Sequence, residues 1–144
     1  MIYVGCDPGK SGAIAVVSQD GLHIDHVKLT ETETDVWRFL YDHSLGRAWL
    51  ERVASRPGQG VSSVFKFGTS YGFLRGILTA TQVRWEEVTP PVWQRVMKCR
   101  SGGDKKITKA AAQRLFPDVK VTHAIADALL IAEYGRRVSR GISG

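Results

Sequence analysis

Three acidic side chains stand where the sequence otherwise predicts an apolar interior. Asp7 ends the first run of β-forming residues, Glu51 lies near the end of a later one, and Asp127 lies in an apolar helical stretch. Burial of a carboxylate is unfavourable unless a cation or hydrogen-bond donors meet it. Asp7 alone has an ordinary explanation, a turn in which it accepts hydrogen bonds from the backbone N–H groups of Gly9 or Lys10. Such a turn does not explain why Glu51 and Asp127 also stand in apolar surroundings.

His123 and Asp127 are the polar residues of the stretch 123–132, which is apolar nearly all round and predicts a buried helix. Their i,i+4 spacing places them on one helix face. A structural role remains open, with Asp127 paired to a lysine or a backbone amide and His123 near the start of the helix. If they converge with Asp7 and Glu51, the four side chains suit Mg²⁺ or Mn²⁺, and the histidine favours Mn²⁺. Two such ions activate water and stabilise the leaving oxygen in phosphodiester hydrolysis.

The positive charge of the chain is concentrated in one segment. The 144 residues have a formal net charge of +6 and a pI of about 9.6. Segment 93–114 has seven basic residues and one acidic residue, so it alone has a charge of +6. Such clustering is typical of proteins that bind a polyanion, although a solvated helix face that only aids solubility is an alternative. The residues expected to contact a phosphate backbone are Arg95, Lys98, Arg100, Lys105, Lys106 and Lys109.

The elements that must position these side chains follow from hydrophobic periodicity and turn residues. The expected strands are 2–6, 13–18, 23–29, 48–53 and 83–88, and the expected helices are 31–43, 62–82, 90–98, 105–115 and 122–138. Three strands in a meander, followed by alternating helices and strands, predict an α/β fold. Its mixed five-stranded sheet has the first three strands antiparallel and is flanked by helices. The first, fourth and fifth strands then lie parallel at the centre, which brings Glu51 close to Asp7.

Glycines recur every fourth residue in the long helix, at Gly68, Gly72 and Gly76. Each destabilises a helix by about 1 kcal/mol relative to alanine, so another element is expected to approach this face closely. That element is either the sheet beneath or a symmetry-related helix across a dimer interface, and the spacing does not decide between them.

The overall composition is that of a single globular domain spanning residues 1–144, with 43% hydrophobic and 24% charged residues. Its two cysteines fit a reducing compartment. No apolar run reaches about 18 residues and no signal peptide is recognisable, so we expect a cytoplasmic protein without a membrane partner.

Four segments, in order, resemble the RuvC family, and more narrowly its phage and prophage crossover junction endodeoxyribonucleases. They are 5–12, 50–53, 57–63 with 65–68, and 126–129. The resemblance implies a ribonuclease H-like fold, a homodimer, and Mg²⁺- or Mn²⁺-dependent nicking of branched DNA such as a Holliday junction, in a bacterial or phage-infected host cell. By position, the implied metal ligands and catalytic residues are Asp7, Glu51, His123 and Asp127. Lys105 matches an active-site lysine by its place after the glycine loop.

Two departures from the family pattern concern substrate choice. Many bacterial members have a lysine just after the fifth strand, where this chain has Gln94. They also have an aromatic residue three positions past the glutamate, which wedges into the junction, where this chain has Ala54. Phe65 or Phe67 could stack on a base instead, or both could be core residues. The alternative is therefore a less specific nuclease that acts on forks, flaps or replication branches.

Other classes of protein explain the sequence less well. Segment 5–11 superficially resembles a P-loop, but three residues instead of four separate its glycines and the following residues are β-forming. A sugar-kinase or actin-like ATPase needs a second lobe. A non-catalytic DNA-binding module would explain the charge and leave the buried carboxylates unexplained.

Overall fold

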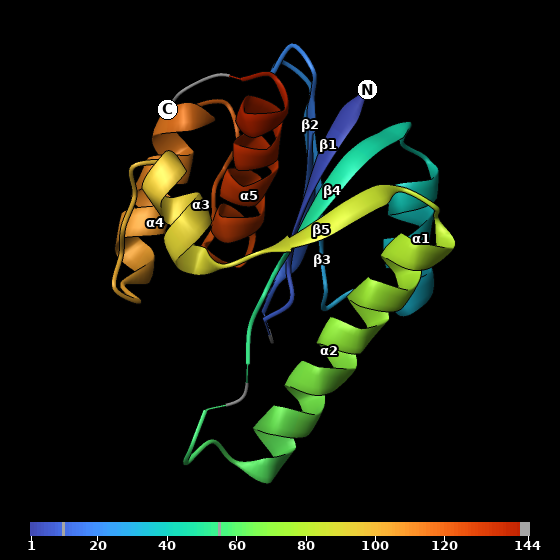
Figure 1. Cartoon of the computed structure of the whole chain (residues 1–144), viewed down its shortest axis with the longest axis vertical. Coiled ribbons are helices and arrows are strands. Elements are labelled where there is room, and N and C mark those ends of the chain that lie inside the picture. The colour runs from blue at the N-terminus through green and yellow to red at the C-terminus, as the bar shows by residue number, and fades with distance from the viewer. Residues whose placement is uncertain (10, 55, 142–144) are drawn as a thin grey trace.

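The computed structural model describes residues 1–9, 11–54 and 56–141 and shows a five-stranded sheet with helices on both faces (Figure 1). The strand order is β3-β2-β1-β4-β5. The strands are β1 Ile2–Asp7, β2 Ala13–Ser18, β3 Ile24–Lys28, β4 Leu45–Glu51 and β5 Arg84–Val88. The helices are α1 Glu33–Tyr41, α2 Val61–Ala80, α3 Pro90–Val96, α4 Lys105–Leu115 and α5 His123–Ser139. Within the described residues, no helix combines the length and hydropathy needed to cross a membrane.

The pairing of the strands confirms the predicted mixed sheet. β1 pairs antiparallel with β2, and β2 pairs antiparallel with β3. β1 pairs parallel with β4, and β4 pairs parallel with β5. The expectation that the fifth strand is central was wrong, because β5 forms an edge of the sheet. β4 also begins earlier than expected, because parallel pairing with β1 extends over Leu45 and Arg47 although a glycine lies between them.

Two hydrophobic clusters cover the two faces of the sheet. One lies between the sheet and α3, α4 and α5, and the other lies between the sheet and α1 and α2. Along β1, Tyr3 belongs to the first cluster, whereas Val4 and Cys6 belong to the second. Because side chains alternate along a strand, Asp7 shares the face of Tyr3, toward α5. In β4, Trp49 belongs to the first cluster, so Glu51 shares that face as well.

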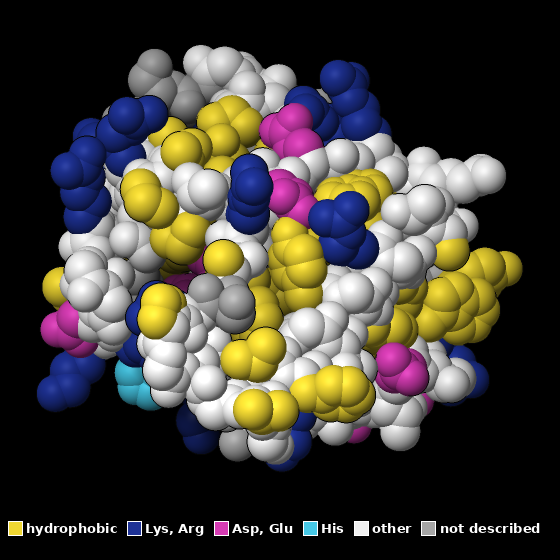
Figure 2. All heavy atoms as spheres, turned by 60° about the horizontal axis from the view of Figure 1, so that its bottom comes forward, with side chains coloured by type: hydrophobic (Ala, Val, Ile, Leu, Met, Phe, Trp, Pro, Cys, Tyr) yellow, Lys and Arg dark blue, Asp and Glu magenta, His cyan; other side chains and the backbone are white. Residues whose placement is uncertain are grey.

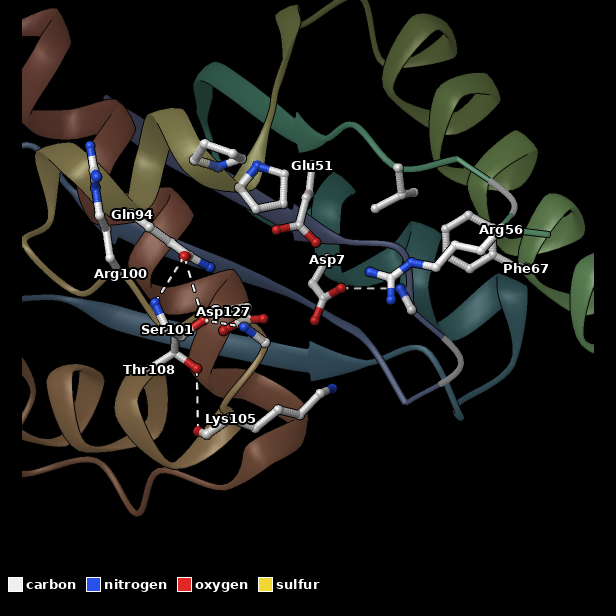
Figure 3. Close-up of a pocket in the computed structure, with 16 residues that line it drawn as sticks. Asp7, Glu51, Arg56, Phe67, Gln94, Arg100, Ser101, Lys105, Thr108 and Asp127 are labelled. Atoms are coloured by element: carbon white, nitrogen blue, oxygen red, sulfur yellow. Dashed lines mark hydrogen bonds between the residues drawn. The ribbon is translucent and has the colours of Figure 1, made fainter. Parts of the chain in front are cut away.

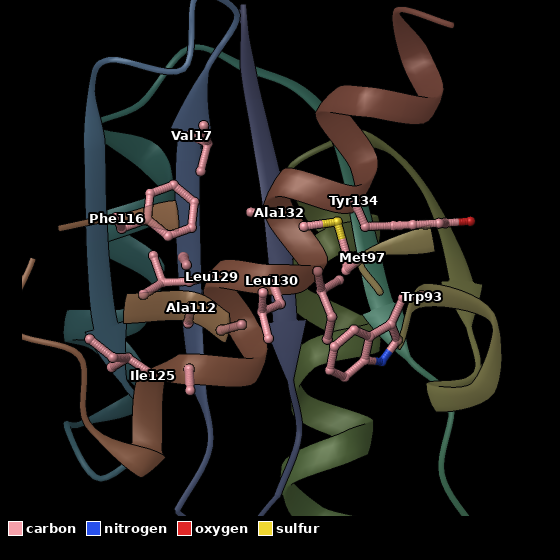
Figure 4. Packing of buried hydrophobic residues seen from close by; sticks show 14 of the residues in the cluster. Val17, Trp93, Met97, Ala112, Phe116, Ile125, Leu129, Leu130, Ala132 and Tyr134 are labelled. Carbon is pink, nitrogen blue, oxygen red and sulfur yellow. The ribbon is translucent and has the colours of Figure 1, made fainter. Parts of the chain in front are cut away.

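Helix α5 packs unusually close to β1, in the cluster drawn in Figure 4. A Cβ atom built on Gly5 would clash with the backbone of Ala128 and Ala132. Only glycine at this position of β1 therefore allows the observed approach. Since Asp127 directly precedes Ala128, the same close contact places Asp127 against the end of the strand that holds Asp7.

Helix α2 packs on the sheet only in its second half, where Leu74, Ile77 and Leu78 are buried, and its first half extends beyond the sheet (Figure 1). Cβ atoms built on Gly68, Gly72 and Gly76 would meet nothing within 4 Å among the described residues. The explanation that the sheet beneath approaches these glycines was therefore wrong, since they lie on the exposed face of α2.

Candidate active site

The carboxylates Asp7 and Glu51 end two neighbouring parallel strands. Cys6 pairs with Leu50, and the next residue of each strand is the acidic one. Asp7 is 9% exposed and Glu51 is 7% exposed. Asp127 approaches them from α5, and all three line one cavity of about 630 Å³ (Figure 3). The predicted meeting of these three side chains is therefore found in the structure.

Burial raises the pKa of each carboxyl group in this cavity. The pKa of Glu51 rises to about 8 because of burial and, next, the negative charge of Asp7. The pKa of Asp7 rises to about 6 because of burial and then the charge of Asp127. Burial also raises the pKa of Asp127, although Thr108 and Lys105 oppose the effect. The surrounding protein groups therefore do not fully stabilise the three negative charges. Such a site is suited to binding a cation.

Two hydrogen bonds hold the strand-borne carboxylates. The backbone N–H of Gly9 donates to Oδ1 of Asp7 at 3.1 Å, and the indole N–H of Trp93 donates to Oε2 of Glu51 at 2.8 Å. The turn explanation for Asp7 is thus correct in its geometry. The turn does not fully compensate the cost of burying the Asp7 carboxylate, because the pKa of Asp7 stays above its ordinary value of 3.8 despite the hydrogen bond from Gly9.

Lys105 also lines the cavity and supplies positive charge there. It begins α4 and lowers the pKa of all three carboxyl groups. The loop before it turns through Gly102 and Gly103, whose φ angles are 58° and 93°, in the region that favours glycine. Asp104 then caps α4 by accepting a hydrogen bond from the backbone N–H of Lys106 at 3.0 Å.

The other predicted DNA-contacting residues divide into two groups. Arg100 lines the cavity with Lys105, and Arg56 joins them from the segment after β4. Arg95, Lys98 and Lys106 are exposed and Lys109 is half-buried, and these four lie outside the cavity lining. Figure 2 shows the end of the molecule that lies at the bottom of Figure 1. On this end, Lys and Arg side chains lie among exposed hydrophobic side chains.

His123 occupies the first position of α5 and is exposed, outside the cavity lining. Its charge acts on Asp127, whose pKa it lowers. Among the described residues, no three His, Cys, Asp or Glu side chains form a group that could hold a metal ion as they stand. The chemistry of the donor set nevertheless fits a hard divalent cation, since three incompletely compensated carboxylates face one space.

The sequence patterns did not predict a role for Trp93 in the site, and they pointed to Gln94 and Phe67 only in connection with substrate choice. Trp93 holds Glu51, as described above, and the signal for it was an indole N–H on a short predicted helix, since such a group needs an acceptor when it is buried. Gln94 accepts hydrogen bonds from the backbone N–H and hydroxyl of Ser101, at 3.3 and 3.4 Å, and so ties α3 to the glycine loop. Phe67 lines the cavity, whereas Phe65 is 74% exposed, so neither is a core residue.

The sheet order and the flanking helices define a ribonuclease H-like fold, and known structures agree with this class. No protein-family model matches the sequence, and no curated protein sequence matches it. The solved structures that are similar to this chain include two of RuvC from Thermus thermophilus. One, in complex with a Holliday junction substrate, has a TM-score of 0.69 and 17% identity, and the other has a TM-score of 0.70 and 18% identity. Each alignment covers 99% of this chain and 98% of the other. The chain therefore has the fold of RuvC over its whole aligned length.

Proposed function

We propose that the protein is a metal-dependent endonuclease that nicks branched DNA and resolves Holliday junctions. The observation that supports this function best is the meeting of Asp7, Glu51 and Asp127, from three different elements, in one cavity. The RuvC fold supports it, since one of the similar structures is a complex with a Holliday junction substrate. Lys105 and Arg100 on the cavity wall provide the positive charge that a scissile phosphate requires.

The metal ligands in this proposal are Asp7, Glu51 and Asp127, with His123 as the fourth. Bound Mg²⁺ or Mn²⁺ ions lower the pKa of water and neutralise charge at a phosphate. The residues of the chain then have separate tasks. Asp7 and Glu51 hold the cations at the strand ends, Asp127 and His123 complete the ligand set, and Lys105 stabilises the charge that develops on the phosphate.

A less specific nuclease for forks, flaps or replication branches is the second candidate. It is favoured by Ala54, an exposed methyl side chain where the family pattern places a wedging aromatic residue. Phe67 is the aromatic residue in position to replace that wedge, because it projects from α2 into the cavity lining (Figure 3). A comparison of nicking rates on four-way, three-way and linear DNA separates the two candidates.

A homodimer is part of the proposal, and the exposed face of α2 is its expected interface. Gly72 shares that face with Val61 and Phe65, which are 88% and 74% exposed. Helices that present glycines can approach each other closely, and the exposed apolar residues add area to bury. The variant Gly72→Leu favours the helix but blocks close approach. We expect it to be a folded monomer in light-scattering measurements, and a dimer of unchanged size would contradict this interface.

The catalytic proposal is tested with labelled junctions and the variant Asp7→Asn. Wild-type protein should nick four-way junctions in Mg²⁺ or Mn²⁺ and not in EDTA. Asp7→Asn should lose nicking by about 100-fold or more, because a cation ligand is lost. It should bind the junction as tightly or more tightly, since a carboxylate that repels phosphate has gone. Retained nicking by Asp7→Asn would refute the assignment, and binding without any nick by wild-type protein would favour the non-catalytic DNA-binding module.

A further inference from the structure

Two buried tryptophans donate their indole N–H groups to carboxylates in this protein. Trp93 donates to Oε2 of Glu51 at 2.8 Å, and Trp49 donates to Oε1 of Glu86 at 2.7 Å. Both tryptophan rings are fully buried, with 0% exposure. The two pairs differ in their acceptors, because Glu51 is buried and lines the cavity, whereas Glu86 is exposed and lies beside Arg47 at 3.7 Å.

We propose that Trp93 is a positioning residue that fixes the orientation of Glu51 for cation binding, an inference that rests on the proposed metal-dependent function. A glutamate has three rotatable bonds, so a carboxylate at a strand end loses conformational freedom when it becomes a ligand. Trp93 donates a hydrogen bond to one carboxylate oxygen of Glu51 and so restricts the rotation of this side chain before any cation binds. A carboxylate has lone pairs for about four partners, so Glu51 can still bind a cation while it accepts this bond.

The donor is rigid because the fold holds it on several sides. Pro90 and Pro91 open α3, and the backbone N–H of Trp93 donates to the carbonyl of Thr89 at 3.2 Å. The Trp93 ring belongs to the hydrophobic cluster beneath α5, close to Met97 (Figure 4). Because this packing holds the indole in one orientation, it is the Glu51 side chain that turns to accept the hydrogen bond.

A purely structural role is the competing explanation, since a buried indole N–H needs an acceptor in any case. Trp49 provides the matched control, because its side chain is as buried as that of Trp93 and its indole N–H also donates to a carboxylate. That carboxylate belongs to Glu86, which lies outside the cavity lining. The variants are Trp93→Phe and Trp49→Phe, which keep an aromatic ring and remove the donor. Mn²⁺ binding is measured by calorimetry on the protein without DNA, and thermal stability is measured in EDTA.

We expect Trp93→Phe to weaken Mn²⁺ binding by about 10-fold or more, the usual effect of losing a group that orients a metal ligand. Trp49→Phe should bind Mn²⁺ as wild-type protein does, although both variants lose some thermal stability. In nicking assays, the Mn²⁺ concentration for half-maximal rate should rise for Trp93→Phe, with the rate at saturating Mn²⁺ largely recovered. Unchanged Mn²⁺ affinity in Trp93→Phe, or an equal loss in Trp49→Phe, overturns the inference.

A measurement on the wild-type protein keeps the test valid if Trp93→Phe fails to fold. In protein with ¹⁵N-labelled tryptophan, the indole signal of Trp93 should shift on titration with Mg²⁺, whereas the signal of Trp49 should not. An unmoved Trp93 signal in protein that binds Mg²⁺ through Glu51 overturns this inference alone. Wild-type protein that binds neither Mg²⁺ nor Mn²⁺ overturns both this inference and the proposed function.

Discussion

The variant Glu51→Gln should stabilise the metal-free protein at alkaline pH, although it removes a residue needed for function. Burial raises the pKa of Glu51 from its ordinary value of 4.5 to about 8 in the folded protein. The unfolded chain therefore releases this proton at lower pH than the folded protein does. Folding stability then falls as the pH rises from about 4.5 to about 8, because the unfolded state binds fewer protons over that range.

The size of the effect follows from the two pKa values. Each tenfold difference in proton affinity corresponds to about 1.4 kcal/mol, so ionisation of Glu51 destabilises the metal-free fold by about 3 to 5 kcal/mol at about pH 9. Glutamine is neutral at every pH and has nearly the same shape, and its amide oxygen can accept the hydrogen bond from Trp93. Glu51→Gln should therefore match wild-type stability at about pH 4 and exceed it by a few kcal/mol at about pH 9.

The assay is urea unfolding in EDTA across this pH range, followed by circular dichroism. Glu86→Gln is the matched control, because Glu86 also accepts an indole hydrogen bond but is exposed and paired with Arg47. We expect no comparable gain at alkaline pH in the control. Added Mg²⁺ should stabilise wild-type protein at about pH 9 and have less effect on Glu51→Gln. Parallel stability curves for Glu51→Gln and wild-type protein would refute the claim that Glu51 is an uncompensated buried carboxylate.

Two further predictions use matched pairs of neighbouring residues. With metal saturating and the DNA fully bound, Lys105→Met should slow nicking by about 100-fold, because Lys105 lines the cavity. Lys106→Met removes a residue expected to contribute to DNA binding only, so under the same conditions it should change the rate by less than about threefold. Equal effects in single-turnover nicking assays would remove Lys105 from the catalytic residues. Phe67→Ala should weaken binding to a four-way junction by about 10-fold relative to linear duplex, and Phe65→Ala should leave this ratio unchanged. A ratio unaffected by Phe67→Ala in gel-shift titrations would leave junction preference to other residues.

Much of the fold could be predicted because local patterns and global topology agree. Hydrophobic runs, turn residues and the alternation of helices with strands were enough for a mixed sheet. The meeting of Asp7 with Glu51 followed from the order of the strands. The edge position of β5 and the early start of β4 were missed, because strand exposure and pairing partners are set by packing and not by local sequence.

The details of the site depended on contacts that are distant in sequence. The close approach of α5 at Gly5 could not be inferred, because any of several helices could have covered that strand. The spacing of His123 and Asp127 correctly placed them near each other. It did not show that His123, at the first position of α5, would be exposed at the helix end. Trp93 was missed because its acceptor lies 42 residues away along the chain.

The metal site is tested most directly with a crystal soaked in Mn²⁺ at about pH 8, in which anomalous scattering locates the ions. We expect ions in the cavity in contact with oxygens of Asp7, Glu51 and Asp127, and the same map shows whether His123 is a ligand. Anomalous peaks elsewhere on the protein, with none at these three carboxylates, would contradict the proposal that this cavity is a metal-dependent nuclease site.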